Sequence, residues 1–159
     1  MAPSPDPAPP PPAYAELCVT TNFTFLTGAS HPEEYVVRAA ALGLSAIAIT
    51  DRNSLAGVVR AHSALRELKR QRDEDQTAPG LGPGLRECDL PRLIIGARLV
   101  LTDSALDWVA LPTDRAAYAR LSRLISLGKG RAPKGDCHLT RADLIEWGQG
   151  MVLIALPQP

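Results

Sequence analysis

The stretch LCVTTNFTFLTGASHPEE, residues 17–34, reads as a short apolar strand, a polar loop and the start of a helix. Ser30 and Glu33 have the spacing of a capping box, and Pro32 falls in the first helical turn, where its missing N–H costs little. The helix is expected to end at Gly43, because glycine suits the left-handed position that follows a helix. The stretch therefore predicts a strand followed at once by a helix, which is the repeating unit of α/β proteins.

Strands and helices continue to alternate along the rest of the chain. The apolar run Ser45–Thr50 is typical of a buried parallel strand, and Asn53 or Ser54 can cap a helix over 55–69. Three further strands are predicted over 93–101, 108–111 and 152–156. A helix is predicted from Thr113 or Asp114 to Gly128, and Thr140 with Asp143 has the spacing of a second capping box. Crossovers of helical length predict a largely parallel sheet. Five strands are too few to close a barrel, so we expect the front part of a longer domain.

The composition limits the classes of protein that need to be considered. A chain of 159 residues with 45% hydrophobic residues and a formal net charge of +0 fits one globular domain and lacks the basic footprint of an autonomous nucleic-acid binder. The three cysteines are widely spaced and odd in number, which argues against a disulfide framework. No apolar run has bilayer length, and the amino terminus lacks the regions of a signal peptide. A cytoplasmic protein with no membrane partner is therefore expected.

Two segments are expected to lie outside the packed domain. Residues 1–13, MAPSPDPAPPPPA, predict a disordered, proline-rich tail. Residues 71–91 carry charged residues followed by glycine and proline, and they predict a mobile surface insertion. The domain itself is predicted to span residues 14–159.

Functional groups of parallel α/β proteins gather at the carboxyl ends of the strands. Three such ends can be located here, at Cys18 to Asn22, Asp51 to Asn53, and Ala97 to Arg98. Their side chains include one carboxylate, Asp51, and no histidine. This is a poor set of groups for hydrolytic chemistry.

The same segments carry a specific resemblance to a known family. The residues LCVTTNFTFLTGASHPEE, RAAALGLSAIAITDRNSLAGVVRAH, IIGARLVL and LPTDRAAYARLSRLISLGKGRAPKGDCHLTRADL are similar to the amino-terminal PHP (polymerase and histidinol phosphatase) domain of bacterial C-family DNA polymerases. Within that family, VTTNF, ITDRNSLAGVVRAH and KGRAPKGDCHLT most resemble the error-prone, damage-inducible branch. The resemblance extends over residues 14–157.

This resemblance implies a PHP-type distorted (β/α) barrel, incomplete in this chain. It implies a parent enzyme that is an error-prone DNA-directed DNA polymerase, a nucleotidyltransferase of translesion synthesis, DNA repair and DNA replication. Magnesium and the catalytic aspartates would belong to a palm domain downstream, so no catalytic residue is expected here. The implied partners are the rest of the polymerase chain, DNA and translesion accessory proteins.

The resemblance also identifies the positions where metal-binding PHP domains hold their ligands. The first histidine pair corresponds to Cys18 and Thr20, the following aspartate–histidine pair to Asp51 and Arg52, and a later glutamate to the region of Arg98 after Gly96 and Ala97. Metal clusters need several anionic or imidazole ligands, and guanidinium groups place positive charge where cations would bind. We therefore expect a degenerate, metal-free site in which Arg52 or Arg98 forms an ion pair with Asp51. The alternative is that both are ordinary surface arginines.

A basic stretch forms a second candidate site. Residues 114–141 contain seven basic and two acidic residues, so this stretch can contact DNA phosphates or an acidic partner, or form an ordinary solvated surface. The candidates for such contacts are Arg115, Arg120, Arg123, Lys129, Arg131 and Lys134. By contrast, the three histidines are scattered: His31 falls in the first turn of a predicted helix, where a solvated side chain is expected, and His62 and His138 lack a nearby acid in sequence.

Three functions remain open at this point. The first is a metal-free PHP segment of an error-prone polymerase, with a structural or docking role and no activity of its own. The second is a metal-dependent phosphoesterase or 3′–5′ exonuclease with a divergent site. The third is an independent binding protein that folds alone, and unpaired strand edges argue against it.

Overall fold

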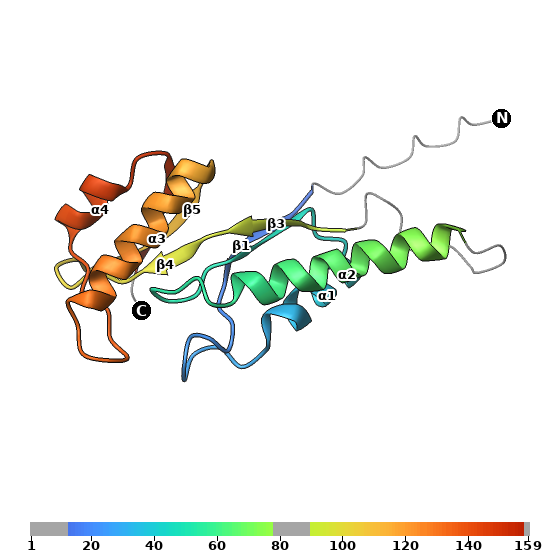
Figure 1. The fold of residues 1–159 in the computed structure, drawn as a ribbon, viewed down its shortest axis with the longest axis horizontal. Coiled ribbons are helices and arrows are strands. Elements are labelled where there is room, and N and C mark those ends of the chain that lie inside the picture. Colours follow the sequence, from blue (N-terminus) through green and yellow to red (C-terminus); the bar gives the residue numbers. More distant parts are fainter. Residues whose placement is uncertain (1–12, 78–89, 158–159) are drawn as a thin grey trace, which may run out of the picture.

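The computed structural model of the protein describes residues 13–77 and 90–157, and in this part of the chain it contains two three-stranded sheets flanked by helices (Figure 1). The predicted tail lies almost entirely outside the described residues, as does most of the predicted insertion. The α/β fold class predicted from the sequence is confirmed.

The first sheet is parallel and has the order β1-β2-β3. Its strands are β1 (Ala15–Val19), β2 (Ala46–Ile49) and β3 (Arg92–Ile95), and the crossovers are α1 (Pro32–Ala41) and α2 (Val58–Thr77). Both helices pack on one face of this sheet and enclose a core that includes Val19, Val36, Ile47, Ile49 and Leu65. All four residues of β2 are buried, as expected for a central parallel strand.

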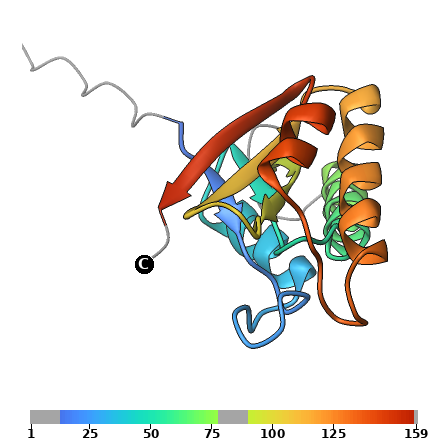
Figure 2. The ribbon, with the colours of Figure 1, turned by 90° about the vertical axis from the view of Figure 1, so that its left-hand side faces the viewer.

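The second sheet is antiparallel and has the order β4-β5-β6. It consists of β4 (Ala97–Leu99), β5 (Leu106–Pro112) and β6 (Met151–Pro157), with α3 (Arg115–Gly130) and α4 (Arg141–Trp147) between β5 and β6. The helices cover one side of this sheet and β6 forms its outer edge (Figure 2). The core between these helices and the second sheet includes Leu99, Leu121, Leu124, Leu139 and Leu144.

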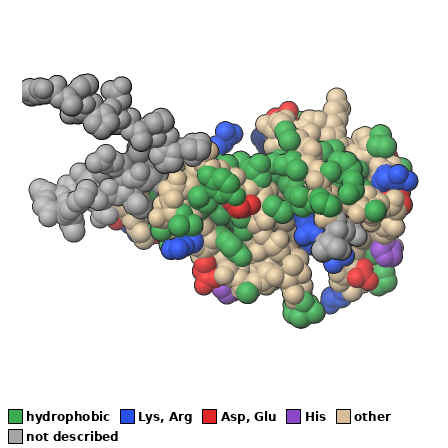
Figure 3. Space-filling model, turned by 180° about the vertical axis from the view of Figure 1, so that it is seen from behind, with side chains coloured by type: hydrophobic (Ala, Val, Ile, Leu, Met, Phe, Trp, Pro, Cys, Tyr) green, Lys and Arg blue, Asp and Glu red, His purple; other side chains and the backbone are tan. Residues whose placement is uncertain are grey.

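Gly96 joins the two sheets. The single strand predicted over 93–101 divides there into β3 and β4, and an isolated parallel bridge pairs Arg52 with Arg98. A small core of Ala48, Val109 and Leu111 contains residues of both sheets. The face seen in Figure 3 carries a broad band of hydrophobic side chains. Val152 and Leu153 of β6 are among the exposed apolar residues, as expected for a barrel wall that is not closed.

Several helix boundaries differ from the prediction. The capping residues of α1 are His31 and Glu34, one position later than predicted, because Pro32 is the first helical residue. The backbone N–H of His31 donates to Glu34 Oε2 at 2.7 Å. Gly43 has a φ of +65°, which confirms the predicted left-handed cap.

The second helix is shifted and longer than predicted. It begins at Val58 instead of Leu55 and continues to Thr77, into the segment predicted to be an insertion. Ion pairs from Arg70 to Glu67 and Glu74, three and four residues away, favour the extension of an exposed helix. The other two caps match the prediction. Asp114 accepts from Ala117 N–H at 2.7 Å, and Thr140 forms a capping box with Asp143.

Candidate functional site at the carboxyl ends of the strands

Asp51 lies at the end of β2 and is the centre of a buried hydrogen-bond network. Its carboxylate accepts from the backbone N–H of Thr21 at 2.8 Å, from the Thr21 hydroxyl at 2.8 Å, and from the Thr24 hydroxyl at 2.8 Å. The Thr24 hydroxyl in turn accepts from the backbone N–H of Arg52 at 3.0 Å. Asp51 and Thr21 are 0% exposed. The network therefore ties the loop after β1 to the loop after β2.

Two glycines allow the chain to pack closely around this network. A Cβ atom on Gly57 would lie 2.7 Å from Asp51 Oδ2, and one on Gly28 would lie 2.0 Å from the carbonyl oxygen of Thr21. A methyl group does not fit at either distance. The space beside the carboxylate is therefore filled by protein backbone.

The predicted ion pair between Asp51 and an arginine is wrong. Arg98 donates from Nε to Asp107 Oδ2 at 2.7 Å and forms a salt bridge from Nη2 to the same oxygen at 2.5 Å. Arg52 is exposed, and no ion pair among the described residues joins it to Asp51. Arg98 contacts Asp51 through the backbone alone, since its N–H donates to the Asp51 carbonyl at 3.1 Å.

Asn53, predicted as a helix cap, has a different role. Its φ of +46° places it in the left-handed region, which asparagine tolerates better than most residues. Its N–H donates to the Arg98 carbonyl at 2.9 Å, and its side-chain oxygen accepts from Val100 N–H at 3.0 Å. Asn53 thus joins the loop after β2 to β4 and the residue that follows it.

The remaining degenerate positions do not converge on a metal site. Cys18 is exposed on β1 and Thr20 is half-buried. Within the described ranges, no three histidine, cysteine, aspartate or glutamate side chains are grouped so that they could hold a metal ion. Both oxygens of Asp51 already accept hydrogen bonds from threonines. These residues do not fit the metal cluster of a hydrolytic PHP domain.

A cavity of about 620 Å³ opens beside these loops. Its charged and titratable lining side chains are Arg52, Lys129, Asp136 and His138, together with Cys137. Burial raises the pKa of the Cys137 thiol, although nearby Lys129 opposes the shift, so this cysteine is a poor nucleophile. The sequence predicts that Arg52 lies at this end of the sheet. It does not predict that Lys129 and His138, which belong to a distant segment, line the same cavity.

Two of the basic side chains predicted to contact DNA or a partner form hydrogen bonds or ion pairs within the domain. Arg120 donates to the Gln149 carbonyl at 2.8 Å, and Arg131 pairs with Asp143 at 2.8 Å. Burial alone would raise the pKa of Asp143, but hydrogen bonds from Thr140 and Arg131 outweigh it and hold that pKa below its usual value. Arg115, Arg123, Lys129 and Lys134 are exposed, and none of them forms a side-chain hydrogen bond or ion pair with another residue in the described ranges 13–77 and 90–157.

The three histidines do not form a common site. His31 is the N-cap of α1, and its Nδ1 lies 2.9 Å from Asn22 Nδ2. His62 is exposed on α2, and His138 is exposed beside the cavity. The main residues that sequence reasoning missed are the two threonines around Asp51, and Asp107.

The fold and the site define the class of protein. The model of the PHP domain family matches residues 16–156, and the chain belongs to this family. A protein assigned as a metal-dependent phosphoesterase from Bifidobacterium adolescentis has a similar fold, with a TM-score of 0.52 and 20% identity over 77% of this chain and 35% of the other.

Closer relatives carry a common name. An error-prone DNA polymerase of Ruegeria pomeroyi is 61% identical over 91% of this chain, and one of Rhodopseudomonas palustris (strain BisB5) is 53% identical over 92%. The resemblance to error-prone polymerases is thereby confirmed. The chain spans 15% and 12% of the length of these two relatives. In the described part of the chain, no helix combines the length and the apolar character needed to cross a membrane.

Proposed function

We propose that this chain is the PHP segment of an error-prone DNA polymerase that copies damaged template in translesion synthesis and DNA repair, in the cytoplasm. The segment has a structural and docking role and binds no catalytic metal. Nucleotide transfer and its magnesium ions belong to another part of the polymerase polypeptide. Support comes from the family, from the relatives and from the degenerate site.

The observation that carries this proposal is the set of partners around Asp51. Asp51 is the ligand-type residue retained among the five degenerate positions, and its two oxygens accept hydrogen bonds from Thr21 and Thr24. A metal ion would have to displace these donors, and the positions that hold imidazoles in metal-binding PHP domains carry Cys18, Thr20 and Arg52 here. Hydrolytic zinc or manganese chemistry needs a fuller set of ligands.

Metal content provides the direct test. The purified full chain is incubated with zinc or manganese, dialysed and analysed by inductively coupled plasma mass spectrometry, with release of the 3′ nucleotide from a labelled oligonucleotide as the second readout. We expect far less than one ion per chain and no metal-dependent release. One ion per chain together with hydrolysis would contradict the proposal and support a phosphoesterase or exonuclease.

Primer extension tests the assignment to a polymerase. The complete polymerase polypeptide is expected to extend a primer past a lesion in magnesium and to stop when the metal is chelated. An Asp51→Asn variant is expected to lose stability while the folded fraction keeps its rate of extension. A rate that falls without any loss of stability would place Asp51 in the catalytic machinery and contradict the structural role.

A further inference from the structure

Two neighbouring hollows lie on the face formed by α2, β3 and the start of α3, away from Asp51. The first has a volume of about 540 Å³ and lies between α2 and β3. The second has a volume of about 370 Å³ and lies between β3 and the start of α3. Arg92, Leu93 and Ile95 line both hollows, so the two form one continuous groove, called here the α2–β3 groove.

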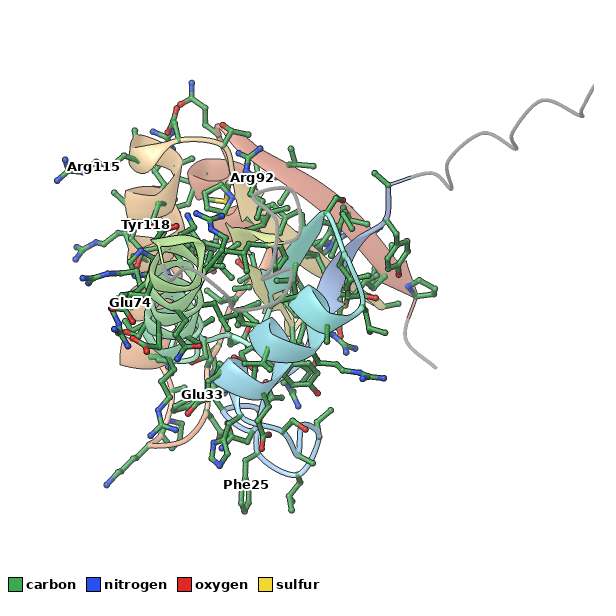
Figure 4. All side chains as sticks on the ribbon, turned by 90° about the vertical axis from the view of Figure 1, so that its right-hand side faces the viewer. Phe25, Glu33, Glu74, Arg92, Arg115 and Tyr118 are labelled. Carbon is green, nitrogen blue, oxygen red and sulfur yellow. The ribbon has the colours of Figure 1, made fainter. Side chains whose placement is uncertain are left out.

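Basic side chains line the rim of this groove. His62, Arg66, Lys69 and Arg72 recur at intervals of three or four residues, so they share one face of α2 and extend over roughly 15 Å of helix. Arg92 lies at the start of β3, and Arg115 lies at the start of α3 (Figure 4). A row of basic side chains with this extent matches the spacing of several successive phosphates along one strand, whereas a single small anion would need only one or two of them.

The nearby carboxylates neutralise only part of this charge. Asp73 pairs with Arg72 at 2.9 Å, and Asp114, in the second hollow, accepts from Ala117 N–H as a helix cap. Glu67 and Glu74 pair with Arg70, which lines neither hollow. Within the described residues, the cations at positions 66, 69, 92 and 115 form no ion pair, and these four are the phosphate-binding candidates of the groove.

The floor of the groove is apolar. Half-buried Leu93 and Ile95 line both hollows, buried Leu65 and Pro91 line the first, and Tyr118, which is 37% exposed, lines the second. A flexible single strand can place its phosphates on a basic rim and its bases against an apolar or aromatic floor. A duplex keeps its bases stacked inside, so it cannot use such a floor.

We propose that the α2–β3 groove binds single-stranded nucleic acid, with Arg66, Lys69, Arg92 and Arg115 on the phosphates and Tyr118 beside a base. This site is separate from the degenerate metal positions and from the basic stretch at 114–141, apart from Arg115. The inference rests on the groove and not on the assignment to a polymerase.

Fluorescence anisotropy with a 5′-labelled oligothymidylate tests the site in the full chain. Four phosphate contacts predict that log affinity falls with log salt with a slope of about −3, because each contact to a single strand contributes about −0.7. The Arg66→Gln/Arg92→Gln variant is expected to reduce the slope to about −1.4. At about 50 mM salt it should weaken binding by roughly 60-fold, since each contact contributes about eightfold there. Both side chains belong to exposed residues, and circular dichroism confirms that the variant is folded.

Matched variants and probes make the test specific. Arg70→Gln on the same helix removes one charge outside the groove and should leave the slope unchanged, and Arg123→Gln/Lys134→Gln tests the rival basic stretch. An unchanged slope in the groove variant, or a reduced slope only in the rival variant, would overturn the proposal. Equal affinity for a duplex of the same length, or equally strong competition by polyglutamate, would overturn the choice of single-stranded nucleic acid. None of these results would alter the metal content that tests the proposed function.

Discussion

Replacing Thr24 with valine removes one hydroxyl from the Asp51 network while keeping the shape of the side chain. Thr24 is 6% exposed, and its hydroxyl donates to Asp51 at 2.8 Å and accepts from the Arg52 N–H at 3.0 Å. The lost bond to a carboxylate costs about 1.5–3 kcal/mol, and the lost bond to the amide about 1 kcal/mol. We therefore expect Thr24→Val to lower the free energy of unfolding by about 2–4 kcal/mol.

Urea denaturation followed by circular dichroism measures this change, and an unchanged m-value would show that the compactness of the two states is preserved. Thr27→Val, at an exposed position of the same loop, is the matched control and should change stability by less than about 0.5 kcal/mol. Thr24→Ser keeps the hydroxyl and should recover most of the loss. The reasoning is refuted if Thr24→Val costs no more than the control, or if the serine variant is as unstable as the valine variant.

Three further changes test other contacts. Gly28→Ala should cost about 3 kcal/mol in urea denaturation, because its Cβ would lie 2.0 Å from the Thr21 carbonyl oxygen, whereas Gly130→Ala, with no atom within 4 Å, should cost nothing. Arg98→Gln should cost about 2 kcal/mol, because it removes the guanidinium from Asp107, and the loss should shrink in an Asp107→Asn background. The pKa of Asp143 is lowered in the folded state, so its stabilising contribution is present above about pH 4 and is lost as the pH falls through the folded value. Asp143→Asn should therefore flatten the loss of stability below about pH 4 in urea titrations, and an equally steep loss would contradict this assignment.

Much of the fold could be predicted from local signals in the sequence. Gly43, Asp114 and Thr140 are caps whose chemistry acts within three or four residues, and all three end or begin helices where expected. The buried strand at Ala46–Ile49 follows from a continuous apolar run. These features depend on neighbours along the chain, which a single sequence contains in full.

The sequence contains a sign of the antiparallel second sheet, although the general alternation of strands and helices favours a parallel one. The connection from Leu99 to Leu106 is too short for a parallel crossover, which needs a dozen residues or more. The apolar run 93–101 predicts one strand, whereas the structure breaks it at Gly96, where the chain leaves the parallel sheet and enters the antiparallel one. A glycine inside an apolar run is a known mark of such a break.

The partners of the charged site residues could not be predicted, because they depend on strand register. In the structure Arg98 lies opposite Val109, so Asp107 is its diagonal neighbour on the same face of the sheet. The expectation that Arg98 pairs with a carboxylate is correct, but the carboxylate that it contacts is that of Asp107 and not that of Asp51. The position of Thr21 and Thr24 against Asp51, some thirty residues away in sequence, likewise follows only from the packing of two loops.

Cys18, Arg52 and Asp51 are three of the positions proposed to be degenerate, and their burial predicts that they tolerate different substitutions. Cys18 and Arg52 are exposed, so replacing a metal ligand there leaves few buried groups without a partner. Asp51 is fully buried, and its loss would leave the Thr21 amide and two hydroxyls without their acceptor. Each unsatisfied donor costs about 1–3 kcal/mol, a large part of the stability of a small domain. Asp51 can therefore be required for folding whether or not the other proposed positions hold metal ligands, and its presence alone is not evidence of metal chemistry.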